Sequence, residues 1–155
     1  MAKRKNNVGR VVEQRWVFGG VDRATRRGFL VLVPDRTQRT LEALIEQFIA
    51  PGSIINSDGF ASYHNIVNLN VQPPYQHIVV NHNRNFVDPA TGACTNLIEN
   101  FWKNCKRRFK AMSTTSQDML PGHLDEFMWR QFNGKTPQAA FNNIIDQLAH
   151  YYAAS

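Results

Sequence analysis

The sequence has little of what membrane and secreted proteins need. No apolar run approaches the roughly 20 residues of a membrane helix, and no apolar segment follows the charged first ten residues as it would in a signal peptide. Cys94 and Cys105 are the two cysteines, and on one helix about 16 Å would separate them, too far for a disulfide. These absences predict a protein that is neither secreted nor membrane-bound and keeps reduced thiols.

Internal repeats and low-complexity tracts are absent as well. The chain has 155 residues, of which 43% are hydrophobic and 19% charged. This is ordinary globular composition, and the length is sufficient for a proper core. We therefore expect a single, partial domain over residues 1–155, of which residues 1–10 form a basic connecting segment.

Acidic residues are scarce relative to basic ones, with 12 Asp and Glu against 18 Lys and Arg and a net charge of +6. Half of the basic residues fall in two short stretches: Lys3, Arg4, Lys5 and Arg10, then Lys103, Lys106, Arg107, Arg108 and Lys110. Such clustering favours contact with the phosphates of a polyanionic partner, and we expect no small-molecule substrate. The alternative is that both stretches are merely solvated basic segments.

The hydrophobic patterning predicts alternating strands and helices. Strands are expected at residues 16–21, 29–33, 53–57 and 77–80, the first two as a hairpin. Helices are expected from a Thr37 cap to about residue 50, and over residues 95–110, 119–133 and 137–152. Loops are expected over residues 65–75 and 81–92. This order indicates an α/β protein with a mixed sheet flanked by helices.

Asp58 is the first candidate for chemistry, because it follows a short strand directly. Functional groups in α/β sheets gather beyond the carboxyl ends of strands, and Gly59 leaves the backbone next to Asp58 unobstructed. An equally good interpretation is structural: Asp is among the best N-cap residues, and Asp58 precedes a short helical segment that runs to about His64.

Glu99 is the second candidate, at the head of a predicted helix. Glu99, Lys103, Lys106 and Lys110 recur at helical spacing on one face, which suits a metal ligand beside a DNA backbone track. Two structural alternatives remain. Glu99 could close a capping box with Asn96, or form an exposed surface pair with Lys103.

A pair of carboxylates at these places fits metal-dependent phosphoryl transfer. Mg²⁺ prefers oxygen ligands and keeps waters and phosphate oxygens around it. Two such ions, about 4 Å apart, stabilise the attacking and the leaving oxygen of an in-line displacement. A third carboxylate is needed, but Asp22, Asp35 and Asp88 all stand where turns are expected.

Several motifs occur in an order that resembles the catalytic domain of a bacterial insertion-sequence transposase group and its eukaryotic relatives, the Merlin transposons. They cover residues 3–132 and are Trp16-Val-Phe-Gly-Gly20, Val33-Pro-Asp-Arg-Thr37, Ser57-Asp58, Asn81-His82, Asn85-Phe-Val-Asp-Pro89, Thr91-Gly92, Thr95-Asn-Leu-Ile-Glu-Asn-Phe-Trp102 and Glu126-Phe-Met-Trp-Arg130. The set in this order is specific, although each piece alone is weak.

The resemblance implies a ribonuclease-H-like fold and an Asp-Asp-Glu triad that holds Mg²⁺ or Mn²⁺. Asp58 matches the second acid of the triad and Glu99 the third. The family's first acid lies on a strand upstream of a basic connection, which here is residues 3–10. We therefore expect that strand and its aspartate to be missing, and a two-metal site only where the aspartate is supplied. The partners implied are transposon ends and target DNA, and a homodimer is compatible with them.

Two other functions remain open. The chain could be a non-enzymatic DNA-binding remnant that uses its basic stretches, or a different metal nuclease on the same fold. The resemblance places a eukaryotic protein of this type in the nucleus and a bacterial one in the cytoplasm or nucleoid.

Overall fold

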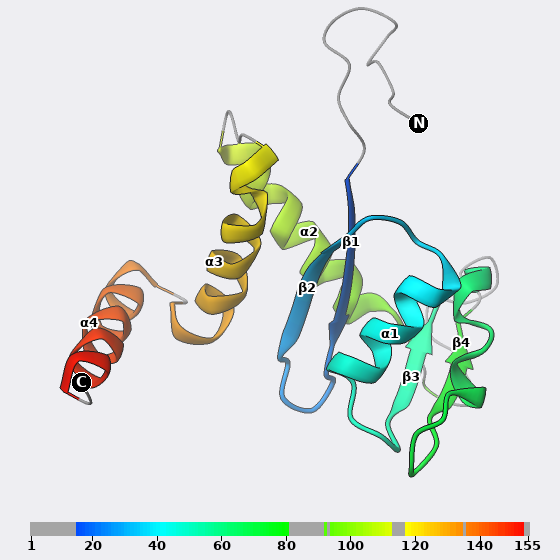
Figure 1. The fold of residues 1–155 in the computed structure, drawn as a ribbon. Coiled ribbons are helices and arrows are strands. Elements are labelled where there is room, and N and C mark those ends of the chain that lie inside the picture. The colour runs from blue at the N-terminus through cyan, green and yellow to red at the C-terminus, as the bar shows by residue number, and fades with distance from the viewer. Residues whose placement is uncertain (1–14, 81–91, 93, 113–116, 135, 154–155) are drawn as a thin grey trace, which may run out of the picture. The chain divides into compact units, whose positions relative to one another are not determined.

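The computed structural model describes residues 15–80, 92, 94–112, 117–134 and 136–153 (Figure 1). These residues form two compact units. The first unit holds the chain up to Phe18 together with Val31–Asn96, and the second holds Gly19–Leu30 and the chain from Leu97 onward. The single domain over residues 1–155 stays a prediction.

The expected hairpin is confirmed, with strand β1 at Trp16–Val21 and strand β2 at Gly28–Val33. Its turn is closed by Asp22, whose carboxylate accepts hydrogen bonds from the Ala24 amide at 2.9 Å and the Thr25 hydroxyl at 2.5 Å. Asp22 thus has the turn-forming role predicted for it. A glycine is required at position 28, because a Cβ atom there would lie 2.8 Å from the Phe101 ring.

Helix α1, Gln38–Phe48, follows the hairpin and begins at the predicted cap. The Thr37 hydroxyl accepts a hydrogen bond from the Thr40 amide at 3.4 Å. Leu41 and Ile45, one turn apart, are almost completely buried. The helix ends two residues earlier than expected, because Ile49 is already extended before the Pro51–Gly52 turn.

Strand β3, Ile54–Ser57, pairs in parallel with strand β4, Gln76–Val79, and Ser57 stands opposite Val79. The connection contains two single-turn 3₁₀ helices, η2 at Ala61–Tyr63 and η3 at Ile66–Asn68. The second lies in a stretch expected to be loop. It forms there because Ile66, 1% exposed, contributes its side chain to the core.

The second unit contains helices α2 at Asn96–Ala111, α3 at Leu120–Asn133 and α4 at Pro137–Ala153, within a residue or so of the predicted ranges (Figure 1). A single 3₁₀ turn, η4 at Gln117–Met119, precedes α3. The Phe101 and Phe127 rings lie 5.2 Å apart and join α2 to α3. The Trp129 indole donates to Gln147 at 2.9 Å and so links α3 to α4.

The mixture of helices and strands confirms the α/β class. The described strands form two sheets of two strands each, β1–β2 and β3–β4, and the ribonuclease-H-like arrangement stays a prediction. Cys94 and Cys105 are both free thiols, as expected. In the part of the chain that the structure covers, every helix is too short or too polar to cross a membrane.

Candidate functional site

Asp58 lies where the sequence predicted, immediately after the last residue of β3. The residue is exposed, and its Oδ1 accepts a hydrogen bond from the Phe60 amide at 3.2 Å. No other hydrogen bond reaches this carboxylate from the described residues. Asp58 is not the N-cap of η2, because that helix begins at Ala61 and has Phe60 in the cap position. Most of the carboxylate is therefore open to a ligand.

The backbone at Asp58 is held by a chain of two hydrogen bonds. The Ser57 hydroxyl lies 2.8 Å from the Asp58 carbonyl oxygen and 2.8 Å from Nε2 of His77 on β4. Because the hydroxyl has one proton and donates it to the carbonyl, Nε2 of His77 must carry a proton and donate to Ser57. Burial, and secondarily the nearby His64, lowers the pKa of His77 and so favours the neutral ring.

Sequence reasoning missed this pair, because Ser57 and His77 lie twenty residues apart. The signal becomes visible once the pairing of β3 with β4 is known. In the parallel register His77 stands opposite Ile55, so strand alternation places it on the same face of the sheet as Ser57.

Tyr63 lies beside the candidate acid. Burial raises the pKa of the Tyr63 phenol, the negative charge of Asp58 raises it further, and the positive charge of Arg36 lowers it. The hydroxyl therefore stays protonated and can donate a hydrogen bond at neutral pH.

Glu99 belongs to the second unit and lies in the first turn of α2, where its side chain is exposed. A carboxylate at this position interacts favourably with the positive end of the helix dipole. The predicted capping box required Asn96 as the cap. In the structure Asn96 is the first residue of α2, and the capping box stays a prediction.

The predicted basic row follows Glu99 along α2. Its four members, Lys103, Lys106, Arg107 and Lys110, are all exposed. Phe101 and Cys105 of the same helix are buried. Burial raises the pKa of the Cys105 thiol to about 11, so this cysteine is an inert core residue and no nucleophile.

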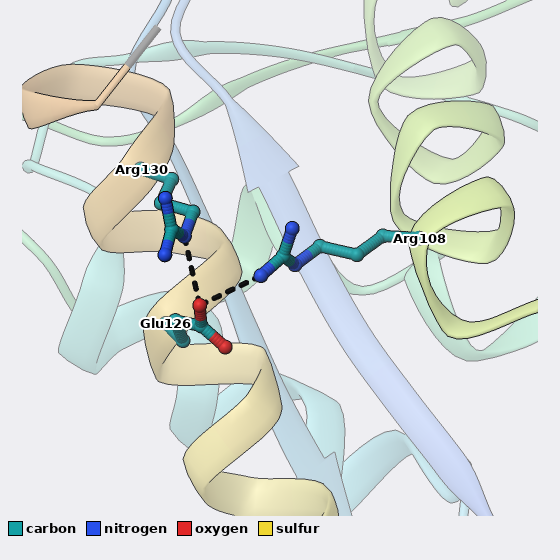
Figure 2. Close-up of polar contacts among 3 residues, drawn as sticks. All are labelled: Arg108, Glu126 and Arg130. Carbon is teal, nitrogen blue, oxygen red and sulfur yellow. Dashed lines mark hydrogen bonds and ion pairs between the residues drawn. The ribbon is translucent and has the colours of Figure 1, made fainter. Parts of the chain in front are cut away.

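Arg108, in the last turn of the same helix, has a different role. It reaches across to α3 and bonds Oε1 of Glu126 at 2.6 Å, and Arg130 bonds the same oxygen at 2.8 Å (Figure 2). The hydrogen bond from Arg130, followed by the charge of Arg108, keeps the pKa of Glu126 below its ordinary value. Glu126 thus links the two helices α2 and α3.

The two other described acids that were weighed as a third ligand are occupied in turns. Asp22 closes the hairpin, and Asp35 accepts from the Thr40 hydroxyl at 2.6 Å, the Thr37 hydroxyl at 2.7 Å and the Thr37 amide at 2.9 Å. These hydroxyl and amide donors lower the pKa of both carboxyls. Asp88 lies outside the described residues, as do Lys3, Arg4, Lys5 and Arg10.

Metal binding can be judged from the chemistry of the donors. Asp58 offers open carboxylate oxygen of the kind that Mg²⁺ prefers, and it fits as one ligand. Among the residues that the structure covers, no three His, Cys, Asp or Glu side chains gather closely enough to hold an ion.

Comparison with known proteins gives a consistent picture. The chain matches the family model of the ISXO2-like transposase domain over residues 1–132, so that α4 follows the matched range. It is also similar to a protein of Haemophilus influenzae described as an uncharacterized transposase-like protein, with 28% identity over 120 residues, which are 77% of this chain and 91% of that protein. No solved structure matches the chain.

Proposed function

Because the chain belongs to the ISXO2-like transposase domain family, we propose that it is the catalytic domain of a DNA transposase, acting by metal-dependent phosphoryl transfer on a ribonuclease-H-like fold. We propose, in addition, that this chain is related to the Merlin transposons. The substrates are transposon ends and target DNA. The domain would act in the nucleus of a eukaryotic host, or in the cytoplasm or nucleoid of a bacterial one. Transfer between two ends would be helped by a homodimer.

The observation that carries the proposal is the state of Asp58. Its carboxylate stands at the carboxyl end of β3, exposed, with a single amide on one oxygen. The Ser57–His77 chain fixes the backbone that bears it. A rigidly mounted carboxylate with open oxygens is what a metal-dependent site needs, because preorganised ligands need no rearrangement as charge develops on the phosphate.

In this function Asp58 and Glu99 would hold Mg²⁺ or Mn²⁺ together with the aspartate that the family has upstream of residue 3. Such an ion, when bound, activates the attacking oxygen and stabilises the leaving oxygen at phosphorus. The residues of this chain have a positioning role. Asp58 would present its carboxylate oxygens to the ion, and the Tyr63 hydroxyl, which stays protonated, would be available as a hydrogen-bond donor.

DNA would bind along α2. The exposed row of Lys103, Lys106, Arg107 and Lys110 leads away from Glu99, so a backbone lying on it is directed towards the acid. Arg108 takes no part in this contact, since its guanidinium is bonded to Glu126.

The test is DNA cleavage with Mg²⁺ or Mn²⁺ by the chain joined to the family's upstream strand and its aspartate. We expect cleavage that Asp58→Ala and Glu99→Ala each reduce by at least about a hundredfold, as removal of a preorganised catalytic group does. Glu126→Gln is the matched control, because this carboxylate is already occupied by two arginines. Cleavage that survives both alanine substitutions would exclude the proposed triad.

A second candidate function is DNA binding without catalysis. It is favoured by the α2 row, which presents four cationic side chains and needs no metal to bind phosphate. It predicts affinity for any DNA sequence that falls steeply with salt, and a fourfold neutralisation to glutamine should lower the salt slope by about three to four units. A DNA affinity that is unchanged by this neutralisation would count against both functions.

A further inference from the structure

Arg36 lies in the short connection between β2 and α1, and its backbone is held in place on both sides. On one side Asp35 accepts three hydrogen bonds from Thr37 and Thr40, which order the start of α1. On the other side the Ser62 hydroxyl donates to the Arg36 carbonyl oxygen at 2.9 Å. The connection is thus tied to the segment that follows Asp58.

The side chain of Arg36 is held by two aromatic rings. Its guanidinium carbon lies 3.7 Å from the centre of the Trp16 ring and 4.9 Å from the centre of the Phe60 ring. Stacking on an aromatic face leaves the N–H groups at the edge of the guanidinium free to donate. The rings also reduce the rotamer freedom that an exposed arginine would lose on binding.

The edge of this guanidinium is available. Arg36 is exposed, and no carboxylate among the described residues lies within ion-pair distance of it. Arg108 and Arg130 show the opposite state, because both donate to Glu126. Arg36 is thus a positioned arginine whose donors are not used within the described part of the chain.

Arg36 and Asp58 share a neighbourhood. The Phe60 amide donates to Asp58, while the Phe60 ring lies by Arg36. The Phe60 and Tyr63 rings are in edge contact at 5.7 Å. The charges of Asp58 and Arg36 act in opposite directions on the pKa of Tyr63, so both lie within electrostatic range of this phenol.

We propose that Arg36, held between Trp16 and Phe60, is a subsite for a DNA phosphate next to Asp58. This inference rests on the proposed transposase function and extends it by a residue outside the α2 row. A phosphodiester brought to Asp58 meets a carboxylate of like charge, and an arginine beside it offsets this repulsion. The planar guanidinium can donate two parallel hydrogen bonds to phosphate oxygens.

The subsite reads no base sequence. Because the guanidinium covers one face of the Trp16 ring, that face is not available to stack a base. The donors at the edge suit a phosphate oxygen, and contacts of this kind fix the register of the strand without reading its sequence. The loss of Arg36 should therefore weaken the binding of all DNA sequences equally.

The first experiment compares two arginines three residues apart. Arg39 is also exposed, but it lies on α1 and has neither ring beside it among the described residues. With a short fluorescent DNA duplex, Arg36→Gln should weaken binding about fivefold to tenfold and lower the salt slope by about one unit. Arg39→Gln should stay within about twofold of the original chain. Equal effects of the two variants would overturn the subsite.

A second experiment needs no variant and so does not depend on the folding of Arg36→Gln. Phenylglyoxal modifies accessible arginines, and mass spectrometry reports each site. Saturating duplex should protect Arg36 and leave Arg39 reactive. Unchanged reactivity of Arg36 would overturn the proposal, and so would protection by inorganic phosphate alone, which would indicate a small-anion site.

These outcomes separate the two proposals. A chain that binds no DNA fails both of them. A chain that binds DNA through the α2 row, with Arg36 reactive and Arg36→Gln harmless, keeps the proposed function and loses the subsite.

Discussion

The neighbourhood of Asp58 and the α2–α3 pair use charge in opposite ways. Asp58 has one amide on its carboxylate, and Arg36 beside it stacks on rings without an anionic partner among the described residues. Glu126 on α3 receives two guanidinium groups on a single oxygen. Open charges suit the binding of metal and phosphate, whereas satisfied charges suit the joining of helices.

The difference shows why a carboxylate cannot be assigned from its residue type. Asp22, Asp35 and Glu126 are all acidic and partly or fully exposed, yet each holds two or more internal donors. A metal would have to compete with these donors. Asp58, at the end of β3, has a single internal donor on its carboxylate. A metal ion would therefore meet less competition there than at these three acids.

The largest expected effect concerns the ring packing that holds α2 to α3. Phe127→Ala removes a side chain that is 3% exposed and contacts Phe101 at 5.2 Å. We expect the free energy of unfolding to fall by about 3–5 kcal/mol. Phe141→Ala on α4 is the matched control, because that ring is 61% exposed. Urea denaturation measures both, and similar losses would show that the Phe101–Phe127 contact is not a core contact.

A smaller effect is expected from the two carboxylates themselves. Glu126→Gln leaves Arg108 and Arg130 with a neutral acceptor and should cost about 1 kcal/mol, because the pair is partly solvent-screened. Asp58→Asn should leave the unfolding free energy unchanged, since the amide oxygen can still accept from Phe60. Chemical denaturation of the two variants side by side is the measurement. A larger loss for Asp58→Asn would mean that Asp58 is a structural residue.

Local patterning predicted most of the elements of this fold. The hairpin, the Thr37 cap and the three late helices follow from strand alternation, capping chemistry and a helical repeat, all of which act over a few residues. The 3₁₀ helix η3 was not predicted, because the burial of its Ile66 side chain in the core leaves no signal in the local sequence pattern. The position of Asp58 after β3 was predicted for the same local reasons.

The surroundings of Asp58 could not be predicted in this way. Trp16, Arg36 and Phe60 belong to three separate stretches of the chain, and His77 reaches Ser57 only through a parallel pairing. The link from Arg108 to Glu126 likewise spans eighteen residues between two helices. The sequence pattern of exposed residues is not periodic, so it does not indicate which distant side chains they contact in the fold.

The pH dependence of stability tests the role of Glu126 in the α2–α3 link. The Arg130 hydrogen bond lowers the folded pKa of Glu126 below its ordinary value of 4.5. A lowered pKa means that the stabilisation is complete above the unfolded pKa and is lost as the pH falls through the folded pKa. The stability difference between the original chain and Glu126→Gln should therefore shrink below about pH 4. Urea midpoints across this range measure it, and a constant difference would indicate that the Glu126 charge does not contribute.

The smallest effect is expected at the α1 cap beside Arg36. Thr37→Ala removes the hydroxyl that accepts from the Thr40 amide at 3.4 Å and donates to Asp35 at 2.7 Å. Because the first of these bonds is long, the loss should be at the lower end for an N-cap, about 0.5 kcal/mol. Thr37→Ser keeps the hydroxyl and should restore stability. Thermal melts of both variants test this. A loss as large as that of Phe127→Ala would mean that the connection bearing Arg36 is part of the core, and the contrast between an open, locally held site and a packed helix pair would fail.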